Sequence, residues 1–152
     1  MKKIVESYKR KLASEEGWVL KRGAKLRIAL CYPNVYAIGM ANLGFQAMYE
    51  LFNNIPEVSC ERVFLPDSSR GFSVEEHSSS ARSVPSGGTE YSRNGSGYNV
   101  KRRKPESRIN ELAEYERTGT TLLSLESQSP VRKFDVIAFS ISFETDYVNM
   151  AR

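Results

Sequence analysis

Two short apolar runs set the strongest limit on how this chain folds. Residues 26–32 read LRIALCY, and residues 134–142 read FDVIAFSIS. The first run is apolar at nearly every position, which is typical of a strand buried on both faces, as in a parallel sheet, and the second is the clearest strand of the chain. A third run, SCERVFL at 59–65, stops at Pro66 and is also interpreted as a strand. We therefore expect a sheet of three strands.

Helical patterns separate these strands. Apolar residues at helical spacing predict helices over 2–13 and 40–52, and further helices are expected at 120–126 and from Glu144 onwards. Strands and helices that alternate along a chain indicate an α/β fold with a parallel sheet and right-handed crossovers. A doubly wound sheet usually has about five or six strands. With only three, we expect the chain to be the front part of a larger protein.

The segment between the second and third strands has a different composition. Asp67–Arg108 holds 11 Ser, 5 Gly and 2 Pro among 42 residues. Such a segment buries too little apolar surface to offset an ordering entropy of about 1–2 kcal/mol per residue. We therefore expect a long flexible insertion at 67–108. The predicted organisation is a helix and tether over 1–23, followed by a partial α/β domain over 24–152 that contains this insertion.

Composition narrows the classes of partner. The chain of 152 residues has a formal net charge of +4, of which the insertion carries +3, with 8 basic and 5 acidic residues. This mild excess does not favour a nucleic-acid partner, and the run Lys101–Lys104 is interpreted as a solvated loop. No apolar run approaches the roughly 20 residues of a membrane helix, and no secretory signal is present, so no membrane partner is expected. Two cysteines, Cys31 and Cys60, suit buried free thiols in a reducing cytoplasm.

Two loops are the candidates for a binding site. Ligands of open parallel sheets bind at the carboxyl ends of the strands, where Pro33–Gly44 and Ser140–Tyr147 are expected. Glycines there allow close approach of the backbone, and amide or hydroxyl groups bind polar atoms. The predicted cofactor-binding residues are Asn34, Tyr36, Gly39, Asn42, Gly44, Ser140 and Ser142. The same residues also suit a plain turn in which Asn42 caps a helix, and both interpretations stay open.

No catalytic residue and no metal ligand is predicted. The single histidine, His77, lies in the insertion, so no Ser-His-Asp or Cys-His arrangement is available. Glu144 and Asp146 are interpreted as acidic residues in the first turn of a helix.

Three segments carry a resemblance to a known family. They read ALCYPNVYAIGMANLGFQAMYELFN, ERVFLP and SLESQSPVRKFDVIAFSISFETDYVN, and cover about residues 25–66 and 120–150. In this order they resemble the N-terminal region of radical S-adenosylmethionine (radical SAM) proteins that carry a cobalamin-binding-like domain before the catalytic barrel. The resemblance implies a flavodoxin-like or Rossmann-like sheet, of which three strands are present, so 24–152 is interpreted as a partial cobalamin-binding-like domain.

The resemblance also implies cofactors. The family's downstream barrel binds S-adenosylmethionine and holds an iron–sulfur cluster through Cys-x3-Cys-x2-Cys. That motif is absent, so the iron–sulfur cluster and S-adenosylmethionine are expected only in a missing downstream part. The usual cobalamin motif is Asp-x-His-x-x-Gly. When Gly44 is aligned to its glycine, Gly39 and Ala41 occupy the Asp and His positions. Cobalamin would bind without a histidine from this chain, or the domain has lost cobalamin and kept a scaffold role.

Two hypotheses for function follow. The first is a noncatalytic N-terminal fragment that covers the active site or positions a corrinoid or substrate, with a radical SAM barrel as partner in cis or in a separate chain. The second is a degraded or split-gene interaction module that pairs its sheet edge with another polypeptide. An uncovered third strand would expose Val136, Ile137 and Phe139 and favour self-association through that edge.

Overall fold

The computed structural model describes residues 1–68 and 110–151, which belong to one compact unit. The predicted insertion therefore lies almost entirely outside the described residues, as do His77 and Lys101–Lys104. The described residues on either side of the gap meet, because the backbone N–H of Glu111 donates to the carbonyl of Asp67 at 3.0 Å. The end of the first described range and the start of the second are therefore hydrogen-bonded to each other.

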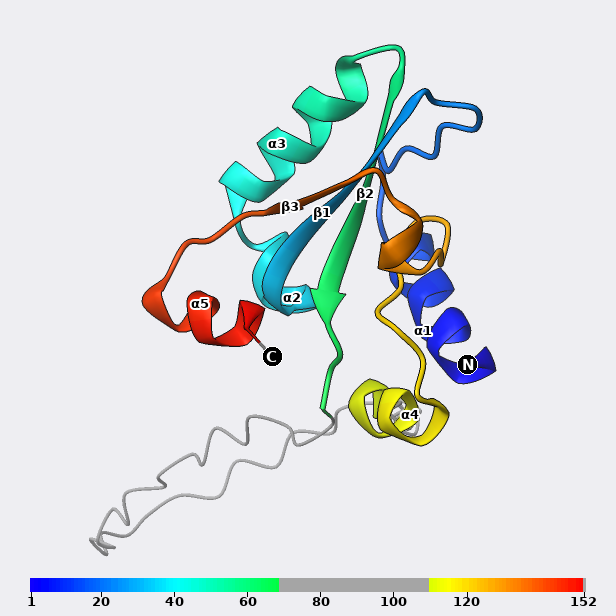
Figure 1. Cartoon of the computed structure of the whole chain (residues 1–152), viewed down its shortest axis with the longest axis vertical. Coiled ribbons are helices and arrows are strands. Elements are labelled where there is room, and N and C mark those ends of the chain that lie inside the picture. Colours follow the sequence, from blue (N-terminus) through cyan, green and yellow to red (C-terminus); the bar gives the residue numbers. More distant parts are fainter. Residues whose placement is uncertain (69–109, 152) are drawn as a thin grey trace, which may run out of the picture. The chain divides into compact units, whose positions relative to one another are not determined.

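The unit is built on a three-stranded parallel sheet with the order β2-β1-β3 (Figure 1). β1 is Leu26–Val35, β2 is Val58–Leu65 and β3 is Val136–Phe139. This arrangement confirms the predicted partial α/β fold. β3 is shorter than the predicted strand, because a 3-10 turn at Val131–Lys133 precedes it and the chain leaves the sheet after Phe139.

Helices precede and connect the strands. α1 is Lys2–Ala13, α2 is Tyr36–Met40, α3 is Leu43–Asn54, α4 is Glu111–Thr118 and α5 is Glu144–Met150. α1 begins and ends where the pattern predicts. The helix predicted over 40–52 is present as α3 but begins at Leu43, because the side chain of Asn42 caps it by accepting the N–H of Phe45 at 2.9 Å. Met40 belongs instead to the separate short helix α2, which was not predicted. No helix in the described residues is long and apolar enough to cross a membrane.

The predicted helix over 120–126 is wrong. Leu123 pairs with Pro130 in an antiparallel bridge, and the residues between them form a turn. The helix of this region is α4, which Asn110 caps and Gly119 ends in a left-handed conformation with φ of 59°. The turn is held in place by side chains rather than by helical hydrogen bonds, as the contacts of Ser124 and Ser127 show below.

Apolar side chains cover the two faces of the sheet unequally. Ile28, Leu30 and Tyr32 of β1 join the larger core, which also receives residues of α1 and α3. On the opposite face a smaller cluster contains Ala29, Cys31, Val63 and Phe134. The side chains of both cysteines are buried. Because Cys31 and Cys60 belong to different clusters, they face opposite sides of the sheet.

The two outer edges of the sheet differ. Residues 122–130 lie beside β2, where the N–H of Leu125 donates to the carbonyl of Arg62 at 2.7 Å (Figure 1). The N–H of Arg62 in turn donates to a carboxylate oxygen of Glu126 at 2.8 Å. No strand in the described residues pairs with the outer edge of β3, and Val136, Ile137 and Phe139 are 41%, 49% and 45% exposed. The predicted exposure of these three residues is confirmed.

Candidate functional site

The two predicted loops meet at the carboxyl ends of β1 and β3. Asn42 follows α2 and Ser142 follows β3, and the Nδ2 of Asn42 donates to the Oγ of Ser142 at 2.9 Å. The Oδ1 of Asn42 caps α3 by accepting the N–H of Phe45, so one residue fixes both the start of the helix and the second loop. The expectation that Asn42 caps a helix is confirmed. Its role in binding a ligand remains a prediction.

Side chains of α5 hold the second loop in place through hydrogen bonds. Asp146 is fully buried, and its Oδ2 accepts the N–H groups of Ser142 and Phe143, each at 3.0 Å. Asn149 donates to the carbonyl of Pro33 at 3.0 Å and so joins α5 to the first loop. Glu144 and Asp146 both lie in the first turn of α5, as predicted. The loop that carries Ser142 is therefore positioned before any ligand arrives.

Gly39 and Gly44 have different surroundings. A Cβ on Gly39 would lie 2.4 Å from the Cε1 of Phe64, which is too close for any side chain. Gly39 is thus required by packing between α2 and β2. A Cβ on Gly44 would approach only the Oδ1 of Asn42, at 3.3 Å. Of the two glycines, only Gly44 leaves its surroundings open to an approaching group.

The remaining predicted residues, Asn34, Tyr36 and Ser140, form hydrogen bonds within the protein. Tyr36 donates its hydroxyl to Glu15 at 2.6 Å, and its ring packs edge-on against Phe64. Burial and the nearby carboxylate of Glu15 raise the pKa of Tyr36. The Oδ1 of Asn34 accepts the N–H of Val35 at 2.9 Å, and the N–H of Ser140 donates to the carbonyl of Cys31 at 2.9 Å. The structure brings Asn42 and Ser142 into contact but directs Tyr36 towards the tether after α1.

These loops offer hydrogen-bonding atoms but no ligand for the cobalt of a corrinoid. The hydroxyl group of Ser142 and the side-chain amide of Asn34 suit hydrogen bonds to the polar groups of a ligand. Within the described residues, no group of three or more His, Cys, Asp or Glu side chains is placed to hold a metal ion. The residues therefore fit a polar ligand better than they fit a metal centre.

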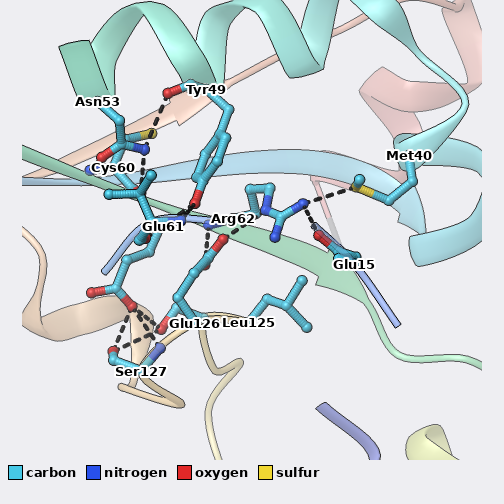
Figure 2. A network of polar contacts seen from close by, with 12 residues as sticks. Glu15, Met40, Tyr49, Asn53, Cys60, Glu61, Arg62, Leu125, Glu126 and Ser127 are labelled. Atoms are coloured by element: carbon cyan, nitrogen blue, oxygen red, sulfur yellow. Dashed lines mark hydrogen bonds and ion pairs between the residues drawn. The ribbon is translucent and has the colours of Figure 1, made fainter. Parts of the chain in front are cut away.

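A second polar cluster surrounds the buried Arg62, which projects from β2 (Figure 2). Its Nε donates to Glu126 at 2.6 Å, and its Nη1 pairs with Glu15 at 2.8 Å and lies 3.1 Å from the sulfur of Met40. The guanidinium lies over the ring of Tyr49, 4.6 Å from the ring centroid. We call Arg62, Glu15 and Glu126 the arginine cluster. It joins the tether, β2 and the 120–130 segment.

The neighbouring residue of β2 forms a matching set of contacts on the other face. Glu61 is buried and accepts the hydroxyls of Ser124 and Ser127 at 2.7 and 2.5 Å. Its second oxygen accepts Arg27 at 3.0 Å. Glu61 and Arg62 point to opposite faces because successive residues of a strand alternate. Together they fasten the turn at 124–127 to both faces of β2.

Burial dominates the protonation of Glu126 in the arginine cluster. It raises the pKa of Glu126 to about 7, although the charge and hydrogen bonds of Arg62 act in the opposite direction. The pKa of Arg62 is raised by Glu126 and Glu15 against the effect of burial, so the guanidinium stays charged. A cavity of about 460 Å³ lies beside the cluster, lined by residues 15–19, α3 and Arg62. The cluster is primarily a structural junction with one carboxyl group that titrates near neutral pH.

Sequence reasoning missed the arginine cluster. Its signal was present as two adjacent charged residues, Glu61 and Arg62, inside an otherwise apolar strand. A buried charge requires a partner, but nothing in the chain indicates that the partner is 64 residues away. The segments quoted for the family resemblance supply both sides, since Arg62 lies in ERVFLP and Glu126 in SLESQSP. Segments that are far apart in sequence therefore recognise each other through these charges.

Comparison with known proteins supports the resemblance over the last third of the chain. The matching family model is described as the N-terminal region of radical SAM proteins, and it matches residues 105–152. This part of the chain is similar to radical SAM proteins. The radical SAM match includes the turn that binds Glu61 and Arg62, the strand β3 and the loop with Ser142. No curated protein and no solved structure gives a significant match.

Proposed function

We propose that the chain is a noncatalytic N-terminal domain of a radical SAM protein that covers the active site of a barrel and positions a corrinoid or a substrate there. The observation that carries the proposal is the contact between Asn42 and Ser142, which joins two loops at the carboxyl ends of parallel strands. The family match at 105–152, which contains one of these loops, supports the same assignment.

The cysteines support a noncatalytic role. An iron–sulfur cluster is held by thiolates that converge on one site, whereas Cys31 and Cys60 face opposite sides of the sheet. Burial raises the pKa of each thiol to about 12, so both are neutral near pH 7. Two protected free thiols also support our proposal that the protein works in a reducing cytoplasm.

Corrinoid binding is tested by mixing the purified chain with hydroxocobalamin and separating free corrinoid by gel filtration. If the loops bind the corrinoid, its visible absorbance elutes with the protein, and Ser142→Ala lowers the retained fraction. Ser14→Ala is the matched control, because Ser14 is an exposed serine whose hydroxyl donates to the carbonyl of Lys11 at the end of α1. An elution profile without retained absorbance would contradict corrinoid binding and leave a substrate or scaffold role.

The covering role needs a second measurement. The chain is titrated into a separately produced radical SAM barrel that carries Cys-x3-Cys-x2-Cys, and binding is followed by calorimetry. We expect binding that Ser142→Trp weakens and Ser14→Trp leaves unchanged, because a bulky ring at the loop rim would obstruct the contact. A chain that binds neither hydroxocobalamin nor the barrel would overturn the proposal.

A second function is favoured by the outer edge of β3, which no described strand covers. The chain would then act as an interaction module that pairs this edge with another polypeptide, without a ligand. Edge strands present unpaired N–H and C=O groups that readily accept a further strand.

A further inference from the structure

The cavity beside the arginine cluster has walls that hydrogen bonds hold in place. Its volume is about 460 Å³, and residues 15–19, α3, Met40 and Arg62 line it. We call it the tether cavity. The hydroxyl of Tyr49 donates to the carbonyl of Val19 at 3.1 Å and accepts the N–H of Val19 at 2.8 Å, which fixes the tether to α3. A volume of several hundred Å³ is typical of sites for small molecules.

Two carboxylates that line the tether cavity have no counter-charge. Glu16 of the tether and Glu50 of α3 are both exposed, and no ion pair engages either of them within residues 1–68 and 110–151. The other charged residues that line the cavity, Glu15 and Arg62, pair with each other at 2.8 Å. The tether cavity therefore carries an excess of negative charge, which attracts cations.

Arg62 offers a hydrogen-bond donor at the same cavity. Its side chain is only 3% exposed, and its Nη2 has no hydrogen-bond partner among the described residues (Figure 2). The charge of Arg62 is already balanced by Glu15 and Glu126. A further anion would be repelled by these two carboxylates, whereas a neutral oxygen would satisfy the buried N–H without adding charge. Nη2 thus favours a hydroxyl or carbonyl oxygen.

Apolar side chains form the rest of the wall. Trp18, which is 40% exposed, lines the tether cavity together with Val19 and Met40. An indole ring attracts ammonium groups as well as apolar groups. A hydrated metal ion would use only the carboxylates, whereas an organic amine would use the carboxylates, the donor and the apolar wall together. The tether cavity therefore fits an organic amine better than it fits an inorganic cation.

We propose that the tether cavity binds a small organic amine that carries a hydroxyl or carbonyl oxygen and an apolar body. Its ammonium group pairs with Glu16 and Glu50, its oxygen accepts an N–H of Arg62, and its apolar body lies against Trp18. Of the residues that line the cavity, only Met40 belongs to the two loops of the candidate site. The inference therefore goes beyond the function proposed above.

The test is a titration of the full chain with 2-amino-1-phenylethanol, followed by the fluorescence of Trp18, which is the single tryptophan of the sequence. We expect a saturable change with a dissociation constant of about 1 mM or tighter. Glu16→Gln and Glu50→Gln should each weaken binding by about fivefold, because each removes one charge that pairs with the amine.

Glu6→Gln is the matched control, since it neutralises an exposed carboxylate of α1 that does not line the tether cavity. It should leave the affinity unchanged. All three variants alter exposed side chains and should melt at the temperature of the wild type, which separates lost binding from lost folding.

Two related probes separate the contacts. 2-Phenylethylamine keeps the amine but lacks the hydroxyl, and we expect it to bind about fivefold more weakly through loss of the bond to Arg62. 2-Phenylethanol keeps the ring and a hydroxyl but lacks the amine, and it should bind about tenfold more weakly or worse. Equal affinity for the two amines would contradict the contact with Arg62.

Two results would overturn the inference as a whole. One is equal affinity for 2-phenylethanol and 2-amino-1-phenylethanol, which would show apolar contact with Trp18 alone. The other is a chain that neither changes its emission nor retains 2-amino-1-phenylethanol in equilibrium dialysis up to about 10 mM. Neither result bears on the proposals for corrinoid and barrel, because those depend on separate measurements at other residues.

Discussion

Arg62 shows how a single residue can organise distant parts of a fold. It is buried in a strand, and its charge is balanced by Glu15 and Glu126 from two other segments. Its Nη2 has no hydrogen-bond partner among the described residues, so the cluster is not fully satisfied. A buried ion pair of this kind adds little to stability compared with apolar packing, but loss of one partner is costly. Its main effect is to specify which segments meet.

The raised pKa of Glu126 gives the first prediction. The pKa of Glu126 is about 7 in the folded state and near 4.5 in the unfolded chain. Between these two pH values Glu126 is protonated in the folded state and ionised in the unfolded chain. The folded state therefore binds more protons in this window, and the contribution of Glu126 to unfolding free energy rises as pH falls from 7 towards 4.5. Urea unfolding across this range should show the rise in the wild type and a flatter profile in Glu126→Gln.

The control for this prediction is Glu6→Gln, which changes an exposed carboxylate of α1. It should keep the pH dependence of the wild type. An unchanged slope in Glu126→Gln would show that Glu126 is ionised throughout this range, with the charge of Arg62 outweighing the effect of burial.

At the scale of elements, side-chain contacts decide what the apolar pattern leaves open. The segment at 120–126 was expected to be a helix, but Ser124 and Ser127 bind Glu61 and hold a turn. Likewise, the helix predicted over 40–52 begins only at Leu43, because Asn42 caps it there. Short polar side chains compete with helical hydrogen bonds, and the winner depends on partners that are distant in sequence.

The double role of Asn42 gives the second prediction. Asn42→Ala removes the cap of α3 and the bond to Ser142, whereas Asn110→Ala removes, among the contacts of the described residues, the cap of α4 alone. A lost cap costs about 1 kcal/mol, and a lost side-chain bond adds about 0.5–1.5 kcal/mol. Chemical unfolding should therefore show a larger loss of stability for Asn42→Ala than for Asn110→Ala.

A double-mutant cycle separates the two contributions of Asn42. The effect of Ser142→Ala should shrink in the Asn42→Ala background, because the shared hydrogen bond is already absent. Strictly additive effects would mean that the two loops are not coupled through this bond in solution.

At the scale of the whole molecule, α1 and α4 are joined by a buried carboxylate. Glu111 accepts Ser7 at 2.6 Å and Lys11 at 2.7 Å, and its other oxygen accepts the N–H of Asp67 at 3.1 Å. Tyr8 and Tyr115 bond beside it at 3.1 Å. One side chain of α4 thus links the first helix to Asp67, which follows β2.

This junction gives the third prediction. Glu111→Gln removes a charge that accepts three donors, and we expect the unfolding free energy to fall by about 1–3 kcal/mol. Glu116→Gln, on the exposed side of the same helix, should change it by about 0.5 kcal/mol or less. Urea unfolding of the two variants makes the comparison, and equal losses would show that the junction contributes nothing specific.

The sequence predicts those parts of the molecule that depend on local pattern. The strands at 26–32 and 59–65 and the helix at 2–13 are recovered, since burial on both faces of a strand leaves a continuous apolar run and burial along one stripe of a helix leaves a clear period. The meeting of the Asn42 and Ser142 loops follows from parallel topology. The pairing of Arg62 with Glu126 and of Glu111 with Lys11 does not follow, because it depends on contacts across 64 and 100 residues.

The blocked edge of β2 limits how far this molecule can assemble. Proteins whose sheets have two open edges can add copies at both, and the result is a growing fibre. Here residues 122–130 occupy the edge of β2, so the described sheet offers only the edge of β3 to a further strand. Edge pairing cannot propagate through both sides of the described sheet, because Leu125 and Glu126 already bind the backbone of Arg62 in β2.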